Sequence, residues 1–151
     1  MKISYNLDIS GHAEEVFHWL DDPERARIWM SSVSSYELLS KPSGMVGTTF
    51  REIVEEDGRR TEMRGVITGY MPNQSISFHL EGKFNAVDVE YRFEEVENRT
   101  RLTLDSDIRF KSLMRVLSIF IKPKIKKKVF KQLSAEFTVL KDLCERDAGR
   151  P

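Results

Sequence analysis

The sequence predicts an α+β fold in which a curved antiparallel sheet of about seven strands wraps around a long C-terminal helix. Between residues 33 and 110, apolar and polar side chains alternate with a period of two, as in strands with one buried face. From residue 124 to 146, apolar positions recur every three or four residues, which predicts a helix of about six turns. Such a helix needs a wide apolar surface, which a strongly bent sheet provides. We expect one domain over residues 1–147 and a frayed tail over 148–151.

The chain opens with a predicted strand and two short helices. Residues 3–9 alternate Ile, Tyr, Leu and Ile with polar side chains, which predicts a half-buried strand. Ser10 is a suitable N-cap for the first helix, whose apolar face is formed by Val16, Phe17 and Leu20. Pro23 suits the first position of the second helix, which we expect to end near residue 30.

Six further strands are expected in the middle of the chain. Their predicted ranges are 33–40, 47–55, 60–70, 74–81, 85–96 and 100–110. Asp57-Gly58 is a strong signal for a hairpin turn between two of them. Because tight turns join successive strands, the pattern predicts an antiparallel meander with one dry face and one wet face.

The last part of the chain has helical spacing. Residues 112–121 are apolar on most sides, and Pro123 then interrupts the helix, so we expect a kink there or the start of a new helix. Beyond the proline, a single apolar stripe is formed by Ile125, Val129, Leu133, Phe137, Leu140 and Cys144.

Composition and charge exclude several classes of protein. The chain is 40% hydrophobic and 32% charged, which is typical of a globular domain. Its 24 basic residues balance 24 acidic ones, whereas a general nucleic-acid binder is expected to have a basic excess. We find no signal-peptide pattern and no apolar run near the ~20 residues of a membrane span. The single cysteine, Cys144, excludes an internal disulfide, so we expect a cytoplasmic protein.

Motifs for catalysis or metal binding are not found. The three histidines, His12, His18 and His79, lack metal-site spacing, so we expect neither a metal nor an organic cofactor. The carboxylate pairs Glu55-Glu56 and Glu94-Glu95 lie beside predicted turns. Neighbouring residues on a strand point to opposite faces, so we interpret these pairs as a solvated rim rather than as acid/base couples.

The candidate site is the inner face of the sheet, where it meets the long helix. A helix over a bent sheet leaves space for a cavity, although core packing is the alternative for each apolar residue. Tyr91 and Ser106 would place hydroxyl groups there, either to orient a ligand or to bond each other or a trapped water. The candidate ligand-binding residues are Trp29, Phe50, Phe78, Val89, Tyr91, Phe93, Leu104, Ser106, Ile108, Lys126, Val129, Phe130 and Leu133.

A lysine cluster follows the apolar segment. It comprises Lys122, Lys124, Lys126, Lys127, Lys128 and Lys131, with no acid among them. At about 100° per residue, most of these lysines lie opposite the apolar stripe, but Lys126 lies within it. Lys126 either reaches the rim or points its ammonium group at the cavity mouth, where it would hold an anionic head group. The preceding segment, 113–121, either packs under the first two helices or touches lipid.

Five short motifs are spread along residues 1–146. They are Ala13-Glu14-Glu15-Val16-Phe17, Leu20-Asp21-Asp22-Pro23-Glu24-Arg25, Trp29-Met30 leading into Val33, Gly47-Thr48-Thr49-Phe50 and Tyr91-Arg92-Phe93-Glu94. In these motifs and in its element order, the chain resembles the START/Bet v 1-like (SRPBCC) superfamily, and within it the polyketide cyclase/dehydrase-like proteins. The resemblance implies a helix-grip fold. It does not define one activity, because the superfamily includes lipid carriers, sterol and polyketide binders, cyclases and chaperone cofactors.

Three functional hypotheses follow from the sequence. The first is a non-catalytic binding or carrier protein for a hydrophobic small molecule, lipid-like or polyketide-like. The second is a cyclase- or hydratase-type enzyme in which Tyr91 or Ser106 assists proton transfer, and it requires a titratable group with a perturbed pKa inside the cavity. The third is an interaction module that contacts an acidic partner or a membrane surface through residues 113–131. No partner of the nucleic-acid class is expected, and the oligomeric state is left open.

Overall fold

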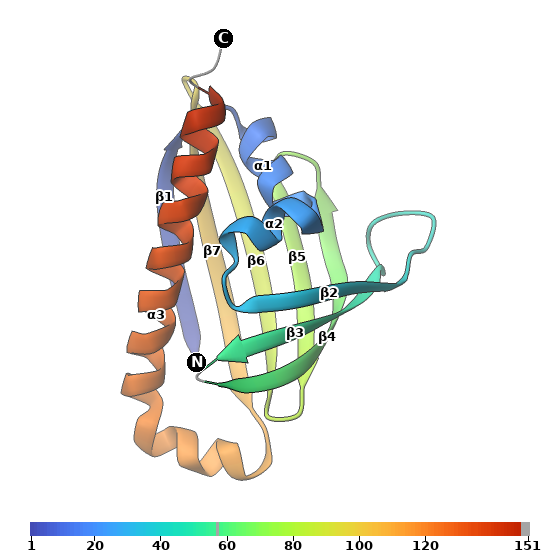
Figure 1. The fold of residues 1–151 in the computed structure, drawn as a ribbon, viewed down its shortest axis with the longest axis vertical. Helices are drawn as coiled ribbons and strands as arrows, with labels where there is room; N and C mark the ends of the chain where they lie inside the picture. The colour runs from blue at the N-terminus through green and yellow to red at the C-terminus, as the bar shows by residue number, and fades with distance from the viewer. Residues whose placement is uncertain (57, 149–151) are drawn as a thin grey trace.

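The computed structural model describes residues 1–56 and 58–148 and contains the predicted elements in the predicted order (Figure 1). Asp57 of the expected hairpin turn lies outside these residues, as does the expected frayed tail except for Ala148, which ends the last helix. The elements are β1 (Lys2–Ser10), α1 (Ala13–Asp21), α2 (Pro23–Trp29), β2 (Val33–Ser40), β3 (Thr49–Glu56), β4 (Arg59–Met71), β5 (Ser75–Gly82), β6 (Asn85–Val96), β7 (Arg99–Phe110) and α3 (Ser112–Ala148).

The seven strands form one antiparallel sheet in the order β1-β7-β6-β5-β4-β3-β2. The first strand therefore joins the sheet beside the last one, with Leu7 opposite Leu102. The register of β4 on β5 shifts between Ile67 and Gly69, an irregularity of the kind that bends a strand. The sheet curves so strongly that β2 and β3 run across the direction of β6 and β7 (Figure 1). The predicted helix-grip fold is confirmed.

The first two helices begin differently from each other. The N-cap of α1 is His12, whose side chain makes no capping bond, so the prediction of Ser10 as the cap is wrong. Ser10 pairs with Arg99 as the last residue of β1, and the helix starts only after it. Glu95 of β6 accepts a hydrogen bond from the Ala13 N–H at 2.6 Å. This bond satisfies one of the free backbone amides in the first turn of α1. α2 begins as predicted, because Pro23 follows an N-cap, Asp22, that accepts from the Glu24 N–H.

The core lies between the sheet and the upper part of α3. Phe137 of α3 is fully buried and packs against Tyr5, Trp29 and Tyr91, with ring centroids 5.2, 5.8 and 6.4 Å away. The Trp29 indole N–H donates to the Trp19 carbonyl oxygen at 2.9 Å, which satisfies the buried polar atom. This core joins β1, both short helices and α3 into one unit.

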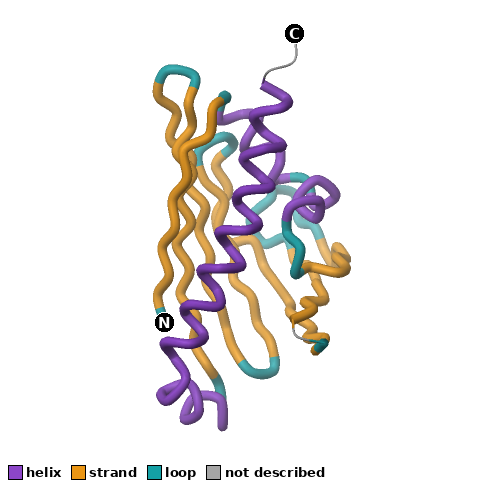
Figure 2. Tube along the Cα trace, turned by 60° about the vertical axis from the view of Figure 1, so that its left-hand side comes forward, coloured by secondary structure: helices purple, strands orange, loops and turns teal. Residues whose placement is uncertain are grey.

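The last helix is continuous from Ser112 to Ala148, with Pro123 inside it. Proline has no N–H for the carbonyl one turn earlier and its ring crowds that carbonyl, so it bends a helix. Figures 1 and 2 show the bend, which separates a short lower arm from the long upper part. Of the two expected alternatives, the structure has the kink and not the start of a new helix. In the part of the chain that the structure describes, no helix combines the length and the apolar character needed to span a membrane.

The lower arm of α3, residues 112–121, does not pack under the first two helices. It lies at the opposite end of the molecule from α1 and α2 (Figure 1). Most of its large apolar side chains are exposed: Leu113, Val116, Leu117, Ile119, Phe120 and Ile121. Of the two alternatives for this segment, packing under the first two helices is wrong, because the bend at Pro123 turns the arm away from them.

Candidate functional site

A cavity of about 310 Å³ lies between the curved sheet, the two short helices and α3. Strands β5, β6 and β7 supply alternate residues to its wall, because only every second side chain of a strand faces the helix. The predicted site residues that line it are Phe50, Phe78, Val89, Tyr91, Leu104, Ser106, Val129 and Leu133. Some residues on the inner face of the sheet therefore belong to the packed core, and others form the wall of the cavity.

The other predicted site residues do not line this cavity. Trp29 is only 2% exposed and belongs to the core, and Phe93 packs against Phe17 with ring centroids 5.2 Å apart. Phe130 faces β1, with its ring centroid 6.4 Å from that of Tyr5. Ile108 lies on the inward-facing register of β7, but further along the strand than the lining residues Leu104 and Ser106.

Lys126 is exposed and does not line the cavity. Its neighbours on the apolar stripe, Ile125 and Val129, are both half-buried, and Val129 lines the cavity. Lys126 follows Pro123 by three residues, so it lies close to the bend of α3. The idea that its ammonium group holds a ligand at the cavity mouth is thus not supported by the geometry.

Two acidic residues that sequence reasoning missed line the cavity, Glu52 of β3 and Glu136 of α3. The sequence did contain a signal for each. Glu52 is two residues from Phe50 and so shares its face of β3, and Glu136 is seven residues from Val129, or nearly two helical turns. Neither residue belongs to the adjacent carboxylate pairs Glu55-Glu56 and Glu94-Glu95. Those pairs include Glu55, whose exposed side chain forms an ion pair with Arg60 at 3.0 Å.

Glu136 is 6% exposed and held by three side chains from two segments. Its Oε1 accepts hydrogen bonds from the hydroxyls of Ser31 (3.3 Å) and Ser32 (3.4 Å) and from the Gln132 amide (3.1 Å). Burial raises the pKa of Glu136, and these hydrogen bonds act in the opposite direction because they stabilise the ionised form. The carboxylate is therefore fixed in position at the junction of α3 and the segment after α2.

Glu52 has a different environment. Burial raises its pKa to about 7, because the ionised form is poorly solvated there. The carboxyl group is therefore close to half-ionised at neutral pH, which suits a group that gives and takes protons.

Tyr91 lies near both carboxylates. Burial raises the pKa of its phenol, and the negative charges of Glu136 and Glu52 raise it further. The phenol therefore keeps its proton at neutral pH and acts as a hydrogen-bond donor rather than as a base. The hydroxyl groups of Tyr91 and Ser106 do not bond each other, although their residues lie on the neighbouring strands β6 and β7.

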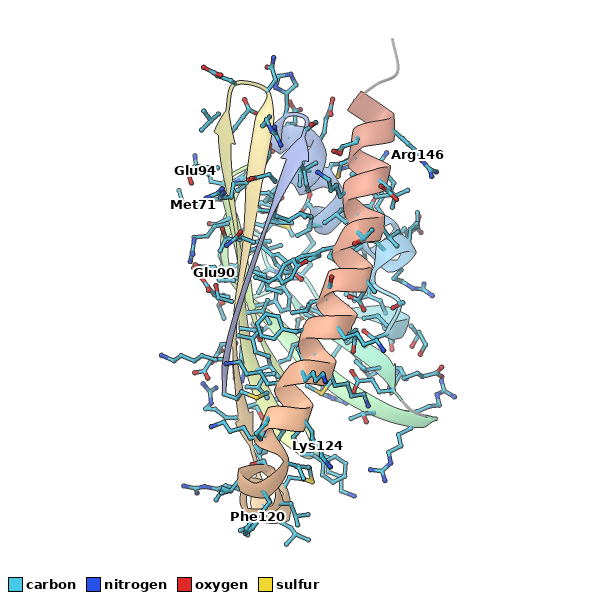
Figure 3. All side chains as sticks on the ribbon, turned by 90° about the vertical axis from the view of Figure 1, so that its left-hand side faces the viewer. Met71, Glu90, Glu94, Phe120, Lys124 and Arg146 are labelled. Carbon is cyan, nitrogen blue, oxygen red and sulfur yellow. The ribbon has the colours of Figure 1, made fainter. Side chains whose placement is uncertain are left out.

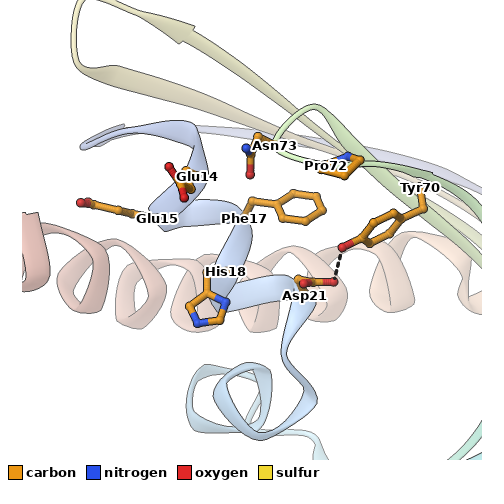
Figure 4. Close-up of a pocket in the computed structure, with 8 residues that line it drawn as sticks. All are labelled: Glu14, Glu15, Phe17, His18, Asp21, Tyr70, Pro72 and Asn73. Carbon is orange, nitrogen blue, oxygen red and sulfur yellow. Dashed lines mark hydrogen bonds between the residues drawn. The ribbon is translucent and has the colours of Figure 1, made fainter. Parts of the chain in front are cut away.

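A second hollow lies on the surface between α1 and the β4–β5 turn (Figure 4). Its volume is about 550 Å³, and the Tyr70 hydroxyl donates to Asp21 Oδ1 at 2.9 Å within it. Burial and the carboxylate of Asp21 raise the pKa of Tyr70 to about 12. Exposed polar residues such as Glu14 and Glu15 form much of its wall. The inner cavity is the stronger candidate, because ligand sites are mostly apolar with a few placed polar groups.

His79 lies on the outer face of the sheet, as the sequence predicted. Its side chain bridges Asp88 (Nδ1 to Oδ1, 2.6 Å) and Glu81 (Nε2 to Oε1, 2.8 Å). The hydrogen bond with Glu81, followed by that with Asp88, raises the pKa of His79. Its strand neighbours Phe78 and Leu80 face the cavity, so His79 itself points away from it.

Residues 1–143 match the model of a family described as polyketide cyclase / dehydrase and lipid transport. No curated protein matches the chain significantly.

Solved structures with the same fold are numerous, and three illustrate the range. A protein from Thermus thermophilus has a TM-score of 0.81 at 15% identity, with 99% of this chain and 100% of that chain covered. The Zhui aromatase/cyclase from Streptomyces also has a TM-score of 0.81 at 15% identity, covering 98% of this chain and 95% of its own. A START superfamily protein from Mycobacterium smegmatis has a TM-score of 0.79 at 18% identity, covering 96% and 97%.

At such identities, these structures bear on the fold alone. The match to the family model covers nearly the whole chain, and the fold agrees with the resemblance already seen in the sequence motifs. The chain therefore belongs to the polyketide cyclase / dehydrase and lipid transport family.

Proposed function

We propose that this protein binds and carries a hydrophobic small molecule, lipid-like or polyketide-like, in the cavity between the sheet and α3. The observation that carries the proposal is the cavity itself, about 310 Å³ beside a closely packed aromatic core. Protein interiors are normally filled to the density of organic crystals, so a space of this size supports a binding role. The family description, which includes lipid transport, supports the same function.

The polar groups of the wall restrict the chemistry of the ligand. The carboxylates of Glu136 and Glu52 can accept hydrogen bonds from a ligand, and the phenol of Tyr91 can donate one. The remaining wall is largely aliphatic and aromatic. A ligand with an apolar body and a hydroxyl or carbonyl group directed toward Tyr91 matches this arrangement, because a buried polar group needs a partner.

Native mass spectrometry of the purified protein tests binding. We expect a bound molecule of lipid or polyketide mass. The substitution Val89→Trp fills the cavity and should reduce the retained ligand more than about tenfold. Glu90→Trp adds the same ring to the neighbouring position on the outer face of β6 and is the matched control. Equal retention by both variants, with normal folding, would contradict binding in this cavity.

Catalysis of the cyclase type is a second candidate, and the position of Glu52 favours it. Its carboxyl group lines the cavity with a pKa raised to about 7. As a carboxylate it would take a proton from a carbon between two carbonyl groups of a polyketide. The resulting enolate would attack another carbonyl carbon of the same chain, and the acid form of Glu52 would return the proton to the alkoxide formed. Tyr91 would donate a hydrogen bond to the carbonyl oxygen that becomes negative.

Turnover of a poly-β-ketone substrate distinguishes the two candidates. Under the catalytic hypothesis, Glu52→Gln lowers kcat by roughly 100- to 10,000-fold, which is the usual contribution of a general acid or base. Glu55→Gln removes a carboxylate from the solvated end of the same strand and serves as the control. Unchanged turnover in Glu52→Gln and Tyr91→Phe would leave neither group a chemical role, and the carrier function would stand alone.

A further inference from the structure

The lower arm of α3, residues 112–121, has the reverse of the usual burial pattern for a surface helix. Leu113 and Ile119 are each 70% exposed and Phe120 is 79% exposed, whereas the polar residue Ser118 is only 7% exposed. The Ser118 hydroxyl donates to the Arg115 carbonyl oxygen at 3.0 Å, so it is satisfied within the helix. Figure 3 shows Phe120 at the extreme lower end of the molecule. An arm that directs its apolar side chains outward has a surface suited to an apolar partner.

The turn between β5 and β6 extends this apolar surface. The Lys111 N–H donates to the Phe84 carbonyl oxygen at 2.8 Å, which holds the turn beside the start of the arm. Phe84 is itself 47% exposed, and the ammonium group of Lys83 lies 5.5 Å from the centre of its ring. Two separate parts of the chain therefore expose apolar side chains at the same end of the molecule.

Positive charge surrounds the arm. From residue 112 to residue 135 the chain contains Arg115 and the six residues of the lysine cluster, and no acidic residue. The lysines of this cluster are exposed, and Figure 3 shows Lys124 immediately beyond the bend from Phe120. A chain with no net charge thus gathers cations next to its most exposed apolar segment.

Exposed apolar side chains beside a cluster of lysines favour one kind of partner over another. A second copy of the chain would bring an identical lysine cluster to the interface, where like charges repel. An anionic bilayer instead offers negative phosphate groups at its surface and an apolar interior a few ångström below. Helices that lie in the membrane interface have the same composition, with bulky apolar residues on one face and lysines beside them.

We propose that the arm docks this protein on an anionic membrane. Phe120, Ile119 and Leu113 enter the boundary between head groups and acyl chains, and the lysine cluster pairs with lipid phosphates. The bend at Pro123 directs the arm away from the body of the domain, so the arm can lie in the interface while the sheet stays in water. Docking of this kind does not require a particular ligand in the cavity, so the two proposals can fail independently.

Vesicle flotation tests the docking. We expect the protein to float with vesicles of phosphatidylcholine mixed with phosphatidylglycerol, and much less with phosphatidylcholine alone. Added salt should weaken binding, because it screens the attraction between exposed charges. Phe120→Glu should weaken it by roughly 10- to 100-fold, the loss expected when a phenylalanine no longer enters an apolar phase. The control is Val96→Glu, which changes a 63% exposed apolar residue at the β6–β7 turn.

The lysine cluster is tested by charge removal. The triple variant of Lys124, Lys127 and Lys131 to Gln should bind roughly 100-fold more weakly, since each lysine near an anionic surface strengthens binding about fivefold. Its control removes three exposed positive charges elsewhere, by changing Arg59, Arg99 and Arg146 to Gln. Circular dichroism and thermal melting establish that all variants are folded.

Four outcomes would overturn the proposal. The first is absence of binding to either kind of vesicle. The second is a dimer in sedimentation experiments that Phe120→Glu dissociates, which would assign the surface to a second copy. The third is binding of polyglutamate without binding of vesicles, which would assign the lysine cluster to an acidic protein. Loss of vesicle binding in Val89→Trp would also contradict it, by showing that docking depends on the cavity.

Discussion

Two carboxylates, Glu52 and Glu136, lie in an otherwise largely apolar cavity, and their surroundings differ. Glu136 accepts three hydrogen bonds from side chains, which offset part of the effect of burial on its pKa. Glu52 has its pKa raised to about 7 by burial. The same residue type therefore has two roles on the two sides of one cavity. Glu136 is a fixed acceptor, whereas Glu52 changes its charge near neutral pH.

Removal of the Glu52 charge should stabilise the protein in a pH-dependent way. The pKa of this group in the folded state, about 7, lies above the ordinary value of 4.5. The folded state therefore holds the proton more tightly, and this contribution to stability is present below about pH 4.5 and lost as the pH rises through 7. Glu52→Gln mimics the neutral acid at every pH. Relative to the unmodified protein, we expect little effect at low pH and a gain of up to about 3 kcal/mol above pH 7, less where cavity water solvates the carboxylate.

Urea denaturation at several pH values measures this difference. Glu55→Gln is the control, because Glu55 is exposed at the end of the same strand and pairs with Arg60 only at the surface. A constant difference between Glu52→Gln and the unmodified protein across the pH range would show that the Glu52 carboxylate is fully solvated.

At the scale of the element, α3 is one helix with two different environments. Its upper part contributes the fully buried residues Phe137 and Leu140 to the core, while its lower arm buries little apart from Ser118. Pro123 separates the two parts and leaves the Ile119 carbonyl without its usual donor from the next turn. A helix segment with few buried contacts opens more easily than one in the core.

Hydrogen exchange should therefore divide α3 at Pro123. We expect amides of residues 114–121 to exchange at least about 100-fold faster than those of residues 133–144, since protection follows the packing that must be broken. Anionic vesicles should slow exchange in the arm and leave the upper helix unchanged. Mass spectrometry of peptic fragments measures both. Uniform protection along α3 would mean that the arm is held by contacts equal to those of the core.

At the scale of the whole molecule, the bend of the sheet creates the cavity. β2 and β3 run across the direction of β6 and β7 (Figure 1), so residues from most of the sheet and from all three helices face one space. The wall therefore includes segments distant in sequence, such as Met30 after α2 and Leu133 in α3. A ligand in contact with so many elements stabilises the folded state as a unit.

Removal of a co-purified ligand should lower the melting temperature. At a ligand concentration of 100 times Kd, binding contributes about 2.7 kcal/mol. For a domain of this size, that amounts to a shift of roughly 5–10 °C. Differential scanning calorimetry of the protein before and after extraction with organic solvent measures the shift, and adding the extract back should restore it. The Val89→Trp variant, with its cavity filled, should show no shift. An equal shift in that variant would locate the ligand elsewhere.

The sequence by itself determined the element order, the faces of the strands and the kink in α3. These features are local: side-chain alternation follows from the geometry of a strand, the stripe from that of a helix, and the kink from the missing N–H of Pro123. It also carried the family resemblance, because the motifs around the two short helices are contiguous in the chain.

Only the tertiary structure decided what covers each face. Phe93 and Tyr91 lie on one face of β6, yet only Tyr91 lines the cavity, because Phe17 of α1 packs against Phe93. The cap of α1 comes from Glu95 of a distant strand rather than from nearby Ser10. The helical angle predicts Lys126 within the apolar stripe, yet its side chain is exposed, three residues after the bend at Pro123. Periodicity determines the direction of a side chain relative to its own element, whereas its surroundings depend on the curvature of the sheet and the bend of the helix.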